Sequence, residues 1–320
     1  MNTYLSQHKL EESEPLAREL LHHQGRYYGR NSPECESTQR ALATIATMHG
    51  RIAEAAVIEE RILQSSISRS APSITTAMGY HRYGKALIML NKLDEAEQNL
   101  VQALELGEAT VGPEDDTFLD VLATLASLHF NRGDSGRAIE VASKVAKSLE
   151  ESLGETHSST IGSESDLAAH LLSDGQQEAS RAKIDRAVAF AHRCLQPEDP
   201  QKFLIFSNAA SIYEDLKLHD LAFALAYKSY KFHQETSGNF SESTLSAMSQ
   251  FGRTLVHQGK MREAEGKLED AEGKFAMADK CLDSCVERTR QTYGSEHRYT
   301  ARRAAQLADL RKRKLHGKPI

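Results

Sequence analysis

The 320-residue sequence contains no tryptophan, only seven prolines and few aromatic residues, which make up 6% of the chain. A single compact core in a chain of this length normally buries several large aromatic side chains. Sparse prolines leave long segments free to stay helical. Because 40% of the residues are hydrophobic and 26% are charged, the composition also excludes a disordered chain. The sequence therefore predicts an elongated, nearly all-helical protein.

Cysteines and long apolar runs are also scarce. Four cysteines do not make a disulfide framework in a chain of this size. Cys281 and Cys285 are one helical turn apart, which favours two small apolar core residues, and no His or Cys stands near them at a zinc-site spacing. No apolar run approaches the roughly 18 residues of a membrane helix, and the N-terminus lacks a signal-peptide core. We therefore expect no metal, no cofactor, no membrane contact and a cytoplasmic location.

The charge is unevenly distributed along the chain, whose formal net charge is −6. Residues 286–320 contain ten Lys or Arg and three acidic residues. A basic tail on an acidic body can bind phosphates or an acidic partner, although a solvated terminus is the commoner interpretation. We expect no nucleic-acid binding, because the tail lacks interleaved aromatic residues and the acidic body would repel a phosphate backbone.

Small residues recur along most of the chain with a period of 42 residues, shortened to 41 at one place. Gly133, Gly175 and Gly259 are separated by 42 and 84 residues and mark junctions between two helical patterns. Seven residues before each junction stand Ala43, Gly84, Ala126, Ala168, Ala210 and Gly252, and five residues after it stand Ala55, Ala96, Ala138, Ser180, Ala222 and Ala264. Chance does not keep small residues at fixed places through six units, so the sequence predicts an internal repeat.

Each repeat predicts a pair of helices. DVLATLASLHFNRG (120–133) and LDEAEQNLVQALELG (93–107) are apolar at helical spacing and represent the first and the second helix of a repeat. Two helices of about 15 residues joined by a tight turn run antiparallel, and small residues let them approach closely where they cross. Asp, Ser or Thr in the loops between repeats can cap the next helix.

Helix pairs with small residues at these places resemble the tetratricopeptide repeat, most clearly in residues 208–230, 124–146 and 294–300. The 42-residue period, longer than the usual 34 or so, and linkers such as GSEHRYT resemble the kinesin light chain subclass. The resemblance implies an all-α, right-handed superhelical solenoid of antiparallel helix pairs. The coiled-coil heptads that join a light chain to a motor heavy chain are absent from this sequence.

We predict an array of about seven repeats over residues 1–297, followed by a basic capping helix and tail over 298–320. The first repeat has only its second helix, which fits either a truncated array or a helix that pairs with another surface. The last repeat is lengthened by about 14 residues near 259–273, so its helix pair should project from the array. This extension is either a tolerated insertion or a contact surface.

The resemblance places the inner, concave surface of the array on the first helices, where related proteins bind an extended peptide or a partner helix. Asn208 matches an asparagine that such proteins use to hydrogen-bond a peptide backbone, and Arg40, Arg82 and Lys85 form a basic stretch suited to carboxylates. For each residue a merely solvated polar side chain is the alternative. The full set of groove candidates is Arg40, His81, Arg82, Lys85, Asp120, Thr124, Asp166, Asn208, Ser211, Gln250 and Arg253.

Motifs for phosphate-loop, serine-hydrolase and zinc-protease chemistry are absent, so we do not expect an enzyme. We expect a protein–protein interaction module or scaffold that binds a peptide or partner helix in its concave groove, with an acidic partner at the N-terminal end. One alternative is a helical-repeat enzyme or regulatory subunit that uses the superhelix as a small-molecule cavity. Another is a self-assembling scaffold, such as a homodimer, that pairs through the uncapped N-terminal helix.

Overall fold

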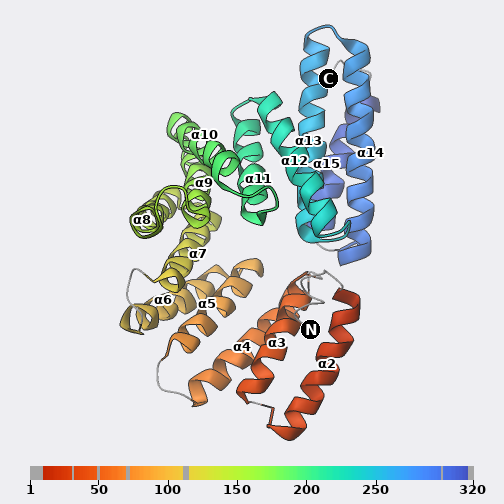
Figure 1. Cartoon of the computed structure of the whole chain (residues 1–320). Helices are drawn as coiled ribbons and strands as arrows, with labels where there is room; N and C mark the ends of the chain where they lie inside the picture. The colour runs from red at the N-terminus through yellow and green to blue at the C-terminus, as the bar shows by residue number, and fades with distance from the viewer. Residues whose placement is uncertain are drawn as a thin grey trace. The chain divides into compact units, whose positions relative to one another are not determined.

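The computed structural model describes residues 10–30, 32–48, 51–69, 73–110, 115–296 and 298–315. Within these ranges the chain forms fourteen α-helices and no β-strand (Figure 1). It divides into two compact units, Met1–Glu155 and Thr156–Ile320, which we call unit 1 and unit 2. The predicted fold class, an all-α solenoid of antiparallel helix pairs, is confirmed. The sequence did not predict the division after residue 155, and the extent of the repeat array stays a prediction.

Unit 1 begins, in its described residues, with a helix that has no first helix before it. This helix is α2 (Leu10–Tyr27). Three helix pairs follow: α3 (Pro33–Met48) with α4 (Ile52–Arg69), α5 (Ile74–Met89) with α6 (Leu93–Thr110), and α7 (Asp116–Arg132) with α8 (Ser135–Leu153).

Unit 2 continues the same alternation and ends, in its described residues, on a first helix without a second. Its pairs are α9 (Ser158–Ser173) with α10 (Gln177–Cys194), α11 (Pro200–Asp215) with α12 (His219–Thr236), and α13 (Glu242–Ala264) with α14 (Leu268–Tyr293), followed by α15 (Arg298–Leu315). The helices α13 and α14 contain 23 and 26 residues, whereas the other helices contain 16 to 19.

The turns inside five of the helix pairs lie within the described residues, and each adopts a left-handed backbone conformation. Gly133, Gly175 and Gly266 provide it with φ values of 82°, 81° and 76°. Asn91 and Lys217 adopt φ values of 60° and 61° at the corresponding places in other pairs. Glycine reaches this conformation without strain, whereas a residue with a Cβ atom does so at a cost of about 1 kcal/mol. The junction predicted at residue 50 lies outside the described residues.

The prediction that Gly259 ends a first helix is wrong. Helix α13 continues through it to Ala264, and Gly266 supplies the turn. Gly259 instead lies where α13 approaches α14, because a Cβ atom at this position would be only 2.5 Å from Cε1 of Phe275. The glycine therefore serves close helix packing, and the added residues extend both helices of the pair.

The predicted crossings at small residues are present in both units. A Cβ atom on Gly84 of α5 would lie 3.0 Å from Leu100 of α6, and one on Gly252 of α13 would lie 2.5 Å from Leu282 of α14. A side chain larger than that of glycine would push these helices apart. The small residues seven positions before each junction thus mark where a first helix packs on its own second helix.

The buried apolar residues form one large cluster in unit 2 and several small ones in unit 1. The unit 2 cluster runs through α9 to α15 and includes Phe206, Phe251 and Phe275. Clusters in unit 1 are limited to neighbouring helices, as in the group around Leu100 and that around Ile45. No described helix is both long and apolar enough for a membrane crossing.

Candidate functional site

All eleven groove candidates lie on first helices, and some of them occupy equivalent positions, by which we mean positions related by the repeat. Arg82, Thr124, Asp166, Asn208 and Gln250 succeed one another at intervals of 42 residues on α5, α7, α9, α11 and α13, and Arg40 on α3 is equivalent to His81 because the first step is 41 residues. Within each unit, neighbouring members of this series or their immediate neighbours contact one another. The repeat therefore produces a row of polar side chains that joins adjacent first helices.

Asn208 is at the centre of the row in unit 2. Its Nδ2 atom donates hydrogen bonds to Oδ1 of Asp166, at 2.9 Å, and to Oγ of Ser165, at 3.1 Å. Desolvation raises the pKa of Asp166 to about 6, and the hydrogen bond from Asn208 opposes this shift. The amide nitrogen that was predicted to bind a peptide backbone thus donates hydrogen bonds to the neighbouring first helix, α9.

Gln250 makes the next connection in the row. Its Nε2 atom donates to the backbone oxygen of Ser207, at 2.9 Å, and to Oγ of Ser211, at 2.7 Å. One helix further on, Ser249 Oγ donates to Oε1 of Gln306 in α15 at 2.6 Å. Hydrogen bonds therefore fix α11, α13 and α15 relative to one another along the face that carries the candidates.

The corresponding face of unit 1 has a different chemistry. Nε2 of His81 lies 2.8 Å from Oγ1 of Thr124. Desolvation, followed by the nearby charges of Lys85 and Arg82, lowers the pKa of His81 to about 4. The imidazole is therefore neutral near pH 7 and connects α5 to α7 as a structural group. Asp120 also lies on α7, and its backbone oxygen accepts a hydrogen bond from Thr124 Oγ1.

The predicted basic stretch of unit 1 contains carboxylates. Arg40 Nη2 lies 3.0 Å from Oε2 of the buried Glu36, which also pairs with Arg69. Desolvation lowers the pKa of Arg82, and the positive charge of Arg40 lowers it further. Glu59 lies close enough to both arginines to feel their charges, and burial raises the pKa of its carboxyl group. These acids partly neutralise the stretch, which makes it a weaker anion site than the sequence suggested.

Unit 2 contains a cavity of about 500 Å³ beside the row of hydrogen bonds. Helices α11, α13 and α15 supply most of its lining, and α12 adds one residue. The lining residues are Leu204, Ser207, Asn208, Ser211, His233, Ser243, Ser246, Ala247, Ser249, Gln250, Arg253, Tyr299, Arg302, Arg303 and Gln306. Four of the candidates, Asn208, Ser211, Gln250 and Arg253, therefore meet in one concave site.

The cavity lining is cationic. It includes three guanidinium groups, those of Arg253, Arg302 and Arg303, and contains no Asp or Glu. Nη1 of Arg253 lies 3.7 Å from the buried Glu214, which balances part of its charge, and Arg303 donates to Oγ1 of Thr289 at 3.1 Å. Arg302 is exposed at the rim. Such a lining favours a ligand that carries negative charge.

The contribution of α15 was missed in the sequence, which predicted only a capping helix there. Gln306 follows Gln250 by 56 residues, the sum of one 42-residue period and the 14-residue insertion. Applying this longer step would have placed α15 as a further first helix and brought Arg302 and Arg303 to the groove. The described residues contain no group of three or more His, Cys, Asp or Glu side chains that could hold a metal ion.

Comparisons with known proteins agree with this architecture. A family model described as "Tetratricopeptide repeat" matches residues 202–272, and a second model with the same description matches residues 76–116. No curated protein sequence matches the chain.

Several solved structures share the fold. BtubC (BKLC) from P. vanneervenii is 15% identical with a TM-score of 0.53, over 78% of this chain and 91% of that one. A Rap protein complexed with competence and sporulation factor is 12% identical with a TM-score of 0.59, over 88% and 76%. A signal transduction ATPase with a tetratricopeptide repeat sensor, from Pyrococcus horikoshii, is 13% identical with a TM-score of 0.54, over 89% and 42%.

The repeated helix pairs and the two family matches identify tetratricopeptide repeats in two segments of the chain, residues 76–116 and 202–272. The 42-residue period of the chain resembles that of the kinesin light chain subclass. Tetratricopeptide repeats generally bind protein or peptide partners, which supports a protein-interaction scaffold.

Proposed function

We propose that the cavity of unit 2 binds a segment of a partner protein, and that the segment carries a carboxylate or another anionic group. The single observation that supports this is the set of three arginines around a concave space without a lining carboxylate. A volume of about 500 Å³ suits a few residues of a peptide rather than a folded surface.

Each part of the cavity has a role in this proposal. The carbonyl oxygen of Asn208 accepts a hydrogen bond from a backbone N–H of the ligand, while the serines of α13 offer hydroxyl groups to its carbonyls. Arg302 and Arg253 contact the anionic group, and the buried guanidinium of Arg303 holds the local potential positive. We place the anion contact here rather than at Arg40 and Arg82, where Glu36 and Glu59 reduce the charge.

The same proposal includes a cytoplasmic, non-catalytic protein. All four cysteines are free thiols, which suits a reducing compartment. Four of the groove candidates, Asn208, Ser211, Gln250 and Arg253, then contact the partner, whereas Asp166 and the candidates of unit 1 mainly hold adjacent first helices together.

The test uses the full chain and a random peptide library displayed on phage. Selected peptides should be enriched in Asp and Glu or should require a free C-terminal carboxylate, and their affinity should fall as salt rises. Arg302→Ser should weaken a selected peptide by about tenfold to a hundredfold, the effect of losing one charge-assisted hydrogen bond.

Arg193→Ser is the matched control, because Arg193 is an exposed arginine of unit 2 outside the cavity, on α10. Peptides that show no acidic preference, or equal losses in the two variants, would contradict the proposal. Circular dichroism on both variants verifies that their helices are intact.

A further inference from the structure

Helix α2 exposes a leucine, Leu20, at a position that the other second helices bury. Leu20 is 40% exposed. Its equivalents on the six other second helices are at most 3% exposed; they are Ile62, Ala103, Val145, Ala187, Ser229 and Cys285. Leu16, one turn before Leu20, is also exposed, whereas its equivalents on the other second helices are half-buried or, as Leu225 on α12, buried. The open face of α2 is therefore one that normally lies inside a helix pair.

Contacts elsewhere identify what normally covers this face. Ser229 Oγ donates to the backbone oxygen of Phe203, and Cys285 Sγ donates to that of Leu245. Phe203 and Leu245 belong to α11 and α13, the first helices of the same pairs. Leu20 is exposed because no described first helix stands at the corresponding place before α2.

Helix α15 shows the complementary opening. Ala308 is exposed, whereas its equivalents on the six other first helices are buried; they are Ala43, Gly84, Ala126, Ala168, Ala210 and Gly252. Second helices cover those equivalents, since Gly84 meets Leu100 and Gly252 meets Leu282. Ala301, on the same face of α15, is exposed too. No described second helix follows α15 to cover it.

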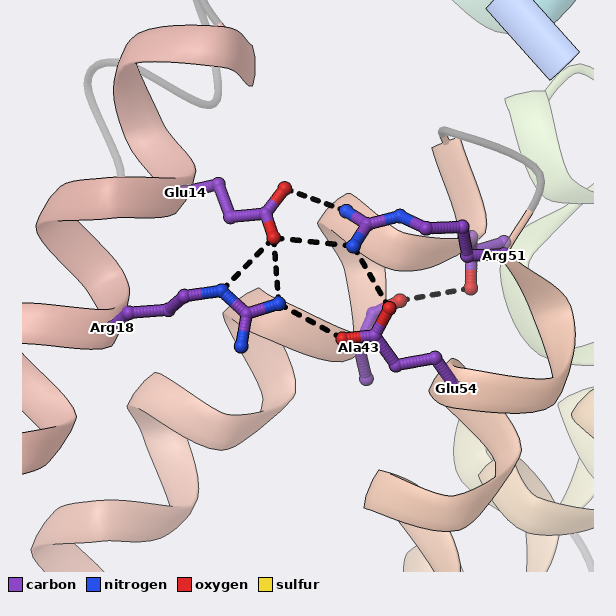
Figure 2. Close-up of polar contacts among 6 residues, drawn as sticks. Glu14, Arg18, Ala43, Arg51 and Glu54 are labelled. Carbon is purple, nitrogen blue, oxygen red and sulfur yellow. Dashed lines mark hydrogen bonds and ion pairs between the residues drawn. The ribbon is translucent and has the colours of Figure 1, made fainter.

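Ion pairs hold both terminal helices in place within their units. Glu14 of α2 contacts Arg51 at 2.6 Å, and Arg18 contacts Glu54 at 2.9 Å, so that two acids and two arginines join α2 to the start of α4 (Figure 2). Arg311 of α15 pairs in the same way with Asp279, at 2.9 Å, and with a second aspartate of α14. Each open face is consequently presented in a fixed orientation.

We infer that α15 of one copy of this chain and α2 of a second copy pair as the first and second helices of a complete repeat. Small side chains at Ala301 and Ala308 leave room for Leu16 and Leu20, as glycine and alanine do at the other crossings. The two whole helices also carry net charges of opposite sign, because α15 contains seven Lys or Arg and one Asp, whereas α2 contains four Glu and two Arg.

The two surfaces are different, so the association is head to tail and leaves one open end of each kind on a dimer. It uses another face of α15 than the cavity, which is lined by Arg302, Arg303 and Gln306. Partner binding in unit 2 and self-association can therefore occur together, and the failure of one leaves the other standing.

Sedimentation of the full chain over a wide concentration range tests the inference. The wild-type chain should grow beyond a dimer as concentration rises, and salt should weaken it. Leu20→Glu and Ala308→Arg should each weaken association by about tenfold or more, which is the effect of losing one buried leucine. Leu221→Glu and Ala109→Arg, which change an exposed leucine of α12 and an exposed alanine of α6, are the matched controls.

Mixing the two variants gives the sharpest result. The Leu20→Glu chain keeps an intact α15 and the Ala308→Arg chain keeps an intact α2, so the mixture should form dimers and nothing larger. A wild-type chain that stays monomeric overturns the inference. So does an association that Leu20→Glu abolishes and Ala308→Arg leaves intact, because this result would mean that α2 pairs with α2.

Disulfide trapping provides an independent readout. A chain with Leu20→Cys and a second chain with Ala308→Cys, distinguished by a size tag, should cross-link to each other on mild oxidation. Leu20→Cys mixed with Ala109→Cys should not cross-link above the level that the four natural cysteines give in the wild-type chain. Equal cross-linking in both mixtures would contradict the predicted helix pair.

Discussion

Units 1 and 2 follow the same repeat but hold their helices together differently. Unit 2 buries one continuous apolar cluster along α9 to α15, and it contains eight of the ten phenylalanines. Unit 1 packs thin layers of Ala, Leu and Ile between neighbouring helices, and ion pairs also join α2 to the start of α4. The repeat thus fixes where residues meet, whereas the side chains at those places decide how strongly they hold.

The largest expected effect concerns the aromatic core of unit 2. Phe206 is 1% exposed and lies 5.6 Å, ring to ring, from Phe203. Phe206→Ala should lower the free energy of unfolding by about 3–5 kcal/mol, since it leaves a cavity in a continuous core. Leu204→Ala, a 49% exposed neighbour, should change it by about 0.5 kcal/mol or less.

Hydrogen exchange locates this effect. Amides of α11 to α13 should exchange faster in the Phe206→Ala variant, whereas those of α5 to α7 should be unchanged. If amide exchange accelerated equally in α11 to α13 and in α5 to α7, the proposed difference between the two units would be wrong, because they would then share one cooperative core.

A smaller loss of folding stability is expected in unit 1 when the pH is lowered. The pKa of His81 is lowered to about 4, so the folded state favours the neutral imidazole. Its contribution to stability is complete above the unfolded value of about 6.5 and is lost as pH falls toward 4. From pH 7 to pH 5 this loss is about 2 kcal/mol.

His81→Ser gives unit 1 the side chain that unit 2 has at the equivalent positions 165, 207 and 249. Urea unfolding at the two pH values, followed by exchange in α5 and α7, should show a smaller acid loss in this variant. If the wild-type chain and the variant lose the same stability in acid, His81 is not the titrating group.

The smallest effect is expected where unit 1 relies on exposed ion pairs. The hydrogen bond from Arg51 is the largest influence on Glu14 and lowers its pKa; burial opposes this, and the hydrogen bond from Arg18 lowers the pKa further. The Glu14 carboxylate therefore stabilises the fold above its usual pKa, and this stabilisation is lost as pH falls. Glu14→Gln should weaken the docking of α2 by about 0.5–1 kcal/mol, because Arg18 is largely exposed.

Amide exchange in α2 at low and high salt measures this loss. Glu19→Gln is the control, since Glu19 has only a distant contact with His23 on the surface. A loss in α2 that is the same for both variants would mean that the ion pairs do not hold the helix, and high salt should leave unit 2 unaffected in either case.

The sequence predicted the helix pairs because small residues, turn residues and helical periodicity all repeat at one interval. It also predicted that Asp166, Asn208 and Gln250 share one face. It could not show that Asn208 would donate to Asp166, because a repeat fixes positions and not side-chain partners. Arg302 and Arg303 were missed because the insertion shifts the interval, and Glu59 was missed because a second helix supplies it.

Small aliphatic side chains fill the core of unit 1, whereas unit 2 has an aromatic core that the overall composition did not indicate. Averaged over the whole chain, 6% aromatic residues argued against one large compact core. The average concealed an uneven distribution, in which Phe203, Phe206, Phe251 and Phe275 all fall within 75 residues or so of one another.

Lengthening by seven residues in α13 and again in α14 has a consequence for how such a chain can change over evolutionary time. Seven residues are close to two full helical turns, so both helices gain length and still point the same side chains in the same directions. Ser249 therefore still meets Gln306 across the insertion. An insertion that is not near a whole number of helical turns would rotate α15 away from α13. The helices of such an array can therefore lengthen only in steps of about one or two turns if the contact between α13 and α15 is to be kept.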